Sequence, residues 1–137
     1  MKETIFTKIV KGEIPSTKVY EDADFLAFLD IQPNNIGHTL LIPKEPYERL
    51  KDIPDELLEK LMVIVKKVSI AVEKGTGAKG INLSVNDGVI AGQEVLHFHL
   101  HIIPRFEDDS FKHGIHVEYE SGEHAEEVGE KIRKELS

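Results

Sequence analysis

The sequence contains no cysteine and no tryptophan among its 137 residues. The lack of cysteine excludes disulfide bonds, thiolate nucleophiles and every metal site that needs a thiolate ligand. Long apolar runs are also absent, and the opening stretch MKETIFTKIVKGEIP interleaves charged and apolar residues too closely for a secretory signal. We therefore expect a cytoplasmic protein with no membrane partner.

Positive charge is scarce, with 17 Lys and Arg against 25 Asp and Glu and a formal net charge of −8. Broad attraction to nucleic-acid backbones is therefore not expected, although a locally positive pocket could still take a small anionic ligand. The length and a hydrophobic content of 40% predict a single domain, residues 1–137, with an ordinary core.

Apolar spacing predicts the first half of the fold. A short helix is expected near 5–10, ended by Gly12 and Pro15. Strands are expected at 18–21, 25–30 and 38–43, and the second is apolar almost throughout, which favours a central position in a sheet. A long helix is expected from Pro54 to about Lys74, with Gly75–Gly77 at its end. Its apolar face comprises Leu57, Leu61, Val65, Val68 and Val72.

The second half begins with a strand, INLSVN, which alternates cleanly. Its inward residues are Ile81, Leu83 and Val85, and its outward residues are Asn82, Ser84 and Asn86. Further elements are a long strand at 93–103, a possible strand at 111–120 and a terminal helix at 123–136. The sum is an α+β domain with a mainly antiparallel sheet, one long helix and short terminal helices.

The stretch HFHLHIIPR holds three of the seven histidines at alternate positions. In a strand, successive side chains alternate faces, so His97, His99 and His101 share one face. Phe98, Leu100 and Ile102 share the other. Pro104, which cannot donate to a ladder, is expected to end the strand.

Two kinds of chemistry fit such a row. The outer two histidines start about 13 Å apart, so two of the three could bind one metal ion but hardly all three, and His38 could complete a site only if folding brings it there. Alternatively, the middle residue, His99, is a nucleophile that its neighbours orient, and a flanking histidine protonates the leaving group. Backbone N–H groups beside Gln93, between Gly88 and the row, could hold phosphate oxygens, although a plain hairpin would also explain the glycines.

The segment HFHLHII resembles the signature of the histidine triad (HIT) family. Four further blocks similar to that family stand in the right order: FLDIQP at 28–33, GHTLLIPK at 37–44, VND at 85–87 and AGQEV at 91–95. The resemblance covers about residues 4–105. Residues 106–137 lie outside it as a C-terminal extension.

The resemblance implies a nucleotidyl hydrolase or transferase of the phosphoramidase or dinucleoside polyphosphate type. Such an enzyme cleaves a purine nucleotide substrate at the α-phosphate through a covalent nucleotidyl-histidine. By position in the motif, His99 is the nucleophile, His97 and His101 flank it, and His38 lies near the phosphate. The resemblance also implies a homodimer with an extended sheet.

Other motif positions imply the nucleotide-binding residues. Asp30 matches the acceptor of the ribose hydroxyls, although an Asp before a turn is commonly a strand-end cap. The matched walls of the base pocket are Phe6, Ile9, Phe28 and Ile31, three of which would ordinarily be read as core. Polar groups near the phosphate are matched by Asn86 and Gln93, and Glu94, next to Gln93, is counted with the nucleotide-binding residues by its position. The remaining histidines, His113, His116 and His124, are read as surface residues.

Two departures from the family pattern narrow the expectation. Zinc-binding members resemble one another in a CxxC and a later histidine, where this sequence has Thr4, Thr7 and Pro46, and only His97 remains of that set. We therefore expect no metal and no cofactor. Glu94 stands where several branches carry Ser or Thr, and its carboxylate would repel a phosphate unless turned away.

Two other functions fit parts of the pattern. One is a nucleotide-binding regulatory protein that keeps the pocket but has little turnover, and the other is a histidine–metal protein. The presence of all three histidines favours the enzyme over the first, and the strand geometry and the missing CxxC disfavour the second.

Overall fold

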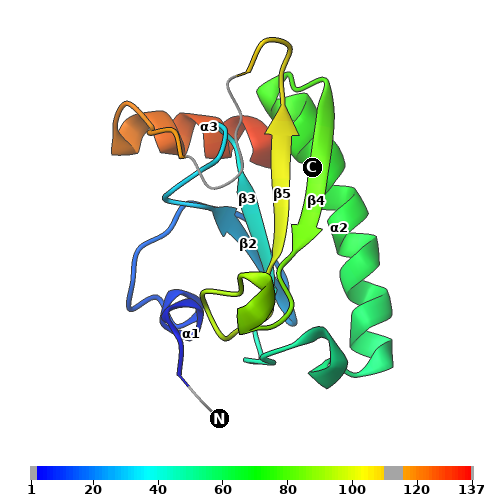
Figure 1. Cartoon of the computed structure of the whole chain (residues 1–137). Coiled ribbons are helices and arrows are strands. Elements are labelled where there is room, and N and C mark those ends of the chain that lie inside the picture. The colour runs from blue at the N-terminus through cyan, green and yellow to red at the C-terminus, as the bar shows by residue number, and fades with distance from the viewer. Residues whose placement is uncertain (1–2, 110–115, 137) are drawn as a thin grey trace.

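The computed structural model describes residues 3–109 and 116–136, within which five strands form one sheet (Figure 1). The strands are β1 (Lys18–Glu21), β2 (Phe25–Leu29), β3 (Thr39–Pro43), β4 (Gly80–Val85) and β5 (Leu100–Arg105). They lie in the order β1-β2-β3-β5-β4, and every neighbouring pair is antiparallel. The predicted α+β class with a mainly antiparallel sheet is thereby confirmed.

Three α-helices accompany the sheet in the described part of the chain: α1 (Ile5–Val10), α2 (Asp55–Thr76) and α3 (Gly122–Lys134). Short 3-10 turns, η1 (Leu50–Asp52) and η2 (Val89–Ala91), lie in the connections. None of the helices in the described ranges is long and apolar enough to cross a membrane.

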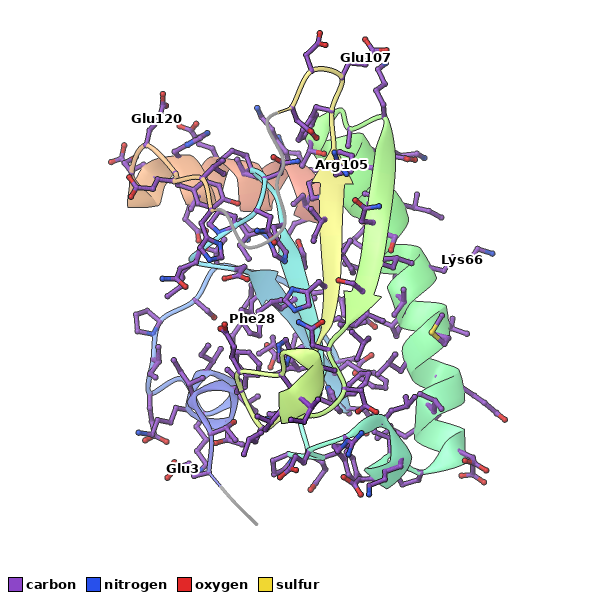
Figure 2. The ribbon with its side chains drawn as sticks, viewed as in Figure 1. Glu3, Phe28, Lys66, Arg105, Glu107 and Glu120 are labelled. Atoms are coloured by element: carbon purple, nitrogen blue, oxygen red, sulfur yellow. The ribbon has the colours of Figure 1, made fainter. Side chains whose placement is uncertain are left out.

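The long helix α2 follows its predicted signals. It begins after Pro54, carries Asp55 and Glu56 near its positive end, and ends at Gly77, whose φ of 76° suits glycine. Its buried residues are Leu61, Val65, Val68, Ala71 and Val72. On the opposite side, Lys66 projects away from the sheet (Figure 2).

The two faces of the sheet are covered by different helices. On one face, α2 and α3 pack over a core that includes Ala27, Leu41 and Ile102. On the other face, Phe6 and Ile9 of α1 pack against a smaller cluster that includes Phe28 (Figure 2). Because α3 contributes to the main core, the described part of the C-terminal extension belongs to the same packed unit.

The strand predicted at 93–103 begins later, at Leu100, and continues through Pro104 to Arg105. It begins late because the backbone of the preceding segment pairs elsewhere: the Phe98 N–H donates to the Tyr47 carbonyl at 2.6 Å. Pro104 is tolerated because β5 pairs with β3 only as far as Ile102 and with β4 alone beyond it.

Three smaller predictions also change. Leu83 is not buried but 49% exposed, because β4 is an edge strand on which Ile81 and Val85 alone pack partly against the core. The strand predicted at 25–30 ends at Leu29. Of the strand expected at 111–120, residues 116–120 form no strand, and 111–115 lie outside the described residues.

Candidate active site

The three histidines of the row lie on the α1 face of the sheet, as the alternation predicts. The rings of His99 and His101 are 5.1 Å apart between centroids. Phe6 of α1 meets His97 and His99 edge-on, at 5.6 Å and 5.0 Å. The alternation therefore persists although only His101 lies within β5.

The hydrogen bond of His99 fixes which ring nitrogen carries its proton. Nδ1 lies 2.8 Å from the His97 carbonyl oxygen, which can only accept, so Nδ1 is the donor. Burial lowers the pKa of His99, and the ring is 8% exposed. The neutral imidazole therefore carries its lone pair on Nε2, the state that a nucleophile requires.

His38 and His101 lie far apart in the sequence, but the fold brings their rings into hydrogen-bonding distance. The Asn34 backbone N–H donates to His38 Nδ1 at 3.0 Å, which leaves the proton of His38 on Nε2. That nitrogen lies 2.9 Å from His101 Nδ1 and donates to it. The proton of His101 therefore lies on Nε2, which makes this nitrogen a donor.

His97 is fully buried and uses both ring nitrogens within the protein. Nε2–H donates to the Pro43 carbonyl at 2.7 Å, and Nδ1 lies 3.1 Å from Thr4 Oγ1. Burial lowers the pKa of His97 and keeps the ring neutral. A residue held in this way cannot protonate a leaving group, so the flanking role expected for His97 is one of support.

Asp30 follows β2 directly and lies beside His38. Its Oδ2 is 3.8 Å from His38 Nε2, and its Oδ1 accepts the Gln32 N–H at 2.9 Å. This contact would be an ion pair only with a protonated His38, but burial lowers the pKa of His38 to about 3, so the ring is neutral. Burial also raises the pKa of Asp30.

Asp30, His38 and His101 offer ligand atoms within 4.8 Å of one another, which is close enough for a metal ion. The hydrogen bonds argue against such a site. Because Asn34 places the proton of His38 on Nε2, this nitrogen lacks the lone pair that a metal would need. The hydrogen bond between His38 and His101 instead fixes where their ring protons lie.

The apolar residues matched to a base pocket lie largely together. Phe6, Ile9 and Phe28 share one buried cluster, with the rings of Phe6 and Phe28 5.5 Å apart. Ile31 is 81% exposed and stands apart from that cluster. A cavity of about 580 Å³ lies next to Ile31 and Asp30, although its lining, taken from the described residues, holds no histidine.

The loop between β4 and the histidines is held by its own contacts. The Gly92 and Gln93 N–H groups donate to the carbonyls of Val89 and Gly88. These two amide groups are therefore already hydrogen-bonded, in contrast to the expectation that they hold phosphate oxygens. The Gln93 side chain is buried, and its hydrogen bonds to other described residues all join backbone groups: it accepts the Gly88 N–H and donates to the Glu48 and Val95 carbonyls. Gln93 therefore supports the loop.

Two polar residues of this region are less tightly held. Asn86 follows the end of β4 and makes a long contact of 3.5 Å with the Gly92 carbonyl. Glu94 is exposed, and its negative charge adds to the burial-driven rise in the pKa of Asp30 and opposes the burial-driven fall in the pKa of His99.

Sequence reasoning missed the C-terminal contribution to this region. His116 lies near enough for a positive charge on its ring to oppose the burial-driven rise in the pKa of Asp30 and to add to the burial-driven fall in the pKa of His38. The Gly37 N–H donates to Tyr119 Oη at 2.8 Å, and the Val117 N–H donates to the Pro33 carbonyl. No local pattern marks these residues, because each contact joins segments far apart in the chain.

The family model described as HIT domain matches residues 11–108. An uncharacterized HIT-like protein of Methanocaldococcus jannaschii is 53% identical over 105 residues, which cover 77% of this chain and 81% of that protein. An adenosine 5′-monophosphoramidase of Saccharomyces cerevisiae is 43% identical over 132 residues, which cover 96% of this chain and 79% of that protein. The crystal structure of a Hit-like protein from Bartonella henselae superposes with a TM-score of 0.88 at 40% identity. The superposition covers 98% of this chain and 96% of that protein.

Proposed function

Because the chain belongs to the HIT domain family, we propose that it is a nucleotide hydrolase that acts through a covalent nucleotidyl-His99 intermediate. The observation that carries this proposal is the hydrogen bond from His99 Nδ1 to the His97 carbonyl, which places a lone pair on Nε2 of a neutral ring. The substrate is a purine nucleoside monophosphate joined through its phosphate to an amine, a second nucleotide or another leaving group. The similar yeast protein, named as an adenosine 5′-monophosphoramidase, supports this class.

In the first step, His99 Nε2 attacks the α-phosphorus. A nitrogen–phosphorus bond forms, the bond to the leaving group breaks, and the leaving group takes a proton from solvent. In the second step, water attacks the same phosphorus and loses a proton to solvent, the nitrogen–phosphorus bond breaks, and the nucleoside monophosphate leaves His99 in its neutral form. No metal or cofactor is needed in either step.

The surrounding residues have separate parts in this proposal. The His101 Nε2–H, directed by His38, donates to a phosphate oxygen and stabilises developing negative charge. Asp30 accepts from the ribose hydroxyls, and the base lies against the apolar residues of α1 and β2 together with Ile31. Asn86 lies on the phosphate side, at the end of β4.

A homodimer is part of the proposal. β4 is an edge strand of the sheet, and edge strands invite pairing with another chain. Exposed apolar side chains lie on β4 and the neighbouring helix α2: Leu83, Met62, Val63 and Ile70. Sedimentation equilibrium tests this arrangement, and a monomer at all concentrations would contradict it. The cytoplasmic location stays an expectation from the sequence.

The catalytic proposal is tested with adenylated and guanylated amines, dinucleoside polyphosphates and sulfates, by measuring the released mononucleotide. His99→Ala should abolish turnover but still bind mononucleotide, because the ribose and base contacts lie elsewhere. Quenching without acid should reveal one nucleoside monophosphate on the peptide that contains His99. An adduct on His38, or near wild-type kcat in His99→Ala, would contradict the assignment. Binding without turnover in the wild type would indicate a regulatory protein instead.

A further inference from the structure

Thr4 begins helix α1 and uses its hydroxyl twice. As the N-cap, Thr4 Oγ1 accepts the Thr7 N–H at 3.2 Å, while the Thr4 N–H donates to Thr7 Oγ1 at 2.8 Å. This reciprocal pair is a capping box, which fixes the start of the helix. The same Oγ1 lies 3.1 Å from Nδ1 of His97, in a segment 93 positions later in the chain.

The direction of the Thr4–His97 hydrogen bond follows from its neighbours. Because the Pro43 carbonyl accepts from His97 Nε2, the lone pair of the neutral ring is on Nδ1. Thr4 therefore donates its hydroxyl proton to His97. Without this donor, a nitrogen of a fully buried ring would have no partner among these groups.

His97 in turn contacts the proposed nucleophile through its main chain. The His97 carbonyl accepts the His99 Nδ1–H at 2.8 Å and so sets the tautomer of His99. The helix that Thr4 caps also carries Phe6, whose ring meets both His97 and His99. One hydroxyl group therefore connects the start of α1 with the ring of the nucleophile.

We propose that Thr4 is a positioning residue for the reaction, whose hydroxyl holds His97 and, through the His97 carbonyl, the ring of His99. The proposal rests on the proposed function for the identity of the reaction. The chain of contacts from Thr4 to His99 can be measured without any substrate.

The main test replaces Thr4 by Val, which keeps the shape but removes the hydroxyl. We expect kcat to fall by about tenfold or more, because a displacement of about 1 Å in a catalytic group can cost up to about 10² in rate. Thr4→Ser should restore most of the loss. Thr76→Val is the matched control: it makes the same substitution at the end of α2, where the Thr76 hydroxyl donates to the Val72 carbonyl at 2.6 Å, and it should leave kcat unchanged.

Nitrogen-15 NMR of the histidine rings supplies the readout that general destabilisation would not move. In folded Thr4→Val, the His97 Nδ1 signal should shift to that of an imidazole nitrogen without a hydrogen bond, and the His99 ring signals should shift with it. Unchanged His97 and His99 signals, or an equal loss of kcat in Thr76→Val, would overturn the proposal. If the wild type proves inactive on every substrate, the proposed function fails, and the NMR shifts alone decide whether Thr4 positions His99.

Discussion

The stability of the protein should fall between pH 8 and pH 5, and His38 should account for a defined part of that loss. The side chain is 1% exposed, and burial lowers its pKa from 6.5 to about 3. Between these two values the unfolded chain binds a proton that the folded chain excludes. Stability from His38 is therefore full above pH 6.5 and declines as the pH falls toward 3.

The size of the effect follows from this gap. One pKa unit corresponds to 1.36 kcal/mol, so the whole shift is worth about 5 kcal/mol. Only the part between the unfolded pKa and pH 5 is lost in the proposed range, which is about 2 kcal/mol. His97 and His99 have lowered pKa values for the same reason and add to the decline. Asp30, whose pKa is raised, opposes it.

The assay is urea unfolding at pH 8 and pH 5, at one fixed protein concentration, for the wild type and His38→Gln. Glutamine offers an oxygen to the Asn34 N–H and an N–H to His101 Nδ1, but it does not titrate. The difference between the two proteins in their pH-dependent loss isolates His38, because the other groups are common to both. If both lose the same free energy of unfolding between the two pH values, the reasoning from burial is refuted.

Three further predictions concern the substrate, metal ions and the C-terminal segment. Ribonucleotide substrates should exceed 2′-deoxy analogues by about tenfold or more in kcat/KM, because an Asp30 carboxylate that lacks the ribose hydroxyl loses about 1–3 kcal/mol of interaction free energy. Equal values would show that Asp30 does not bind the ribose. Activity should survive exhaustive chelation. If elemental analysis finds one zinc per chain and chelation removes the zinc and the activity together, the protein requires a metal. Tyr119→Phe should lower the free energy of unfolding by about 1–3 kcal/mol, because the buried Gly37 N–H loses its acceptor; an unchanged urea midpoint would mean that another acceptor replaces it.

The sequence by itself determined features that depend on local periodicity. Alternation places His97, His99 and His101 on one face whether or not the backbone forms a ladder, because successive extended residues point to opposite sides. Helical spacing identified the buried face of α2, and Gly77 marked its end. Ordered motif blocks identified the family, since they depend only on residue type and order.

The tertiary structure decided what depends on contacts between distant segments. His38 meets His101 because β3 pairs with β5, and Thr4 meets His97 because α1 packs beside the histidine row. Pairing of Phe98 with Tyr47 sets where β5 begins, and the edge position of β4 leaves Leu83 exposed. The spacing of apolar and polar residues along the sequence indicates which face of a strand or helix a residue occupies. It does not indicate which other strand or helix packs against that face. The ring tautomers on which the proposed roles of His99 and His101 rest therefore follow from the folded chain, which places each donor beside its acceptor.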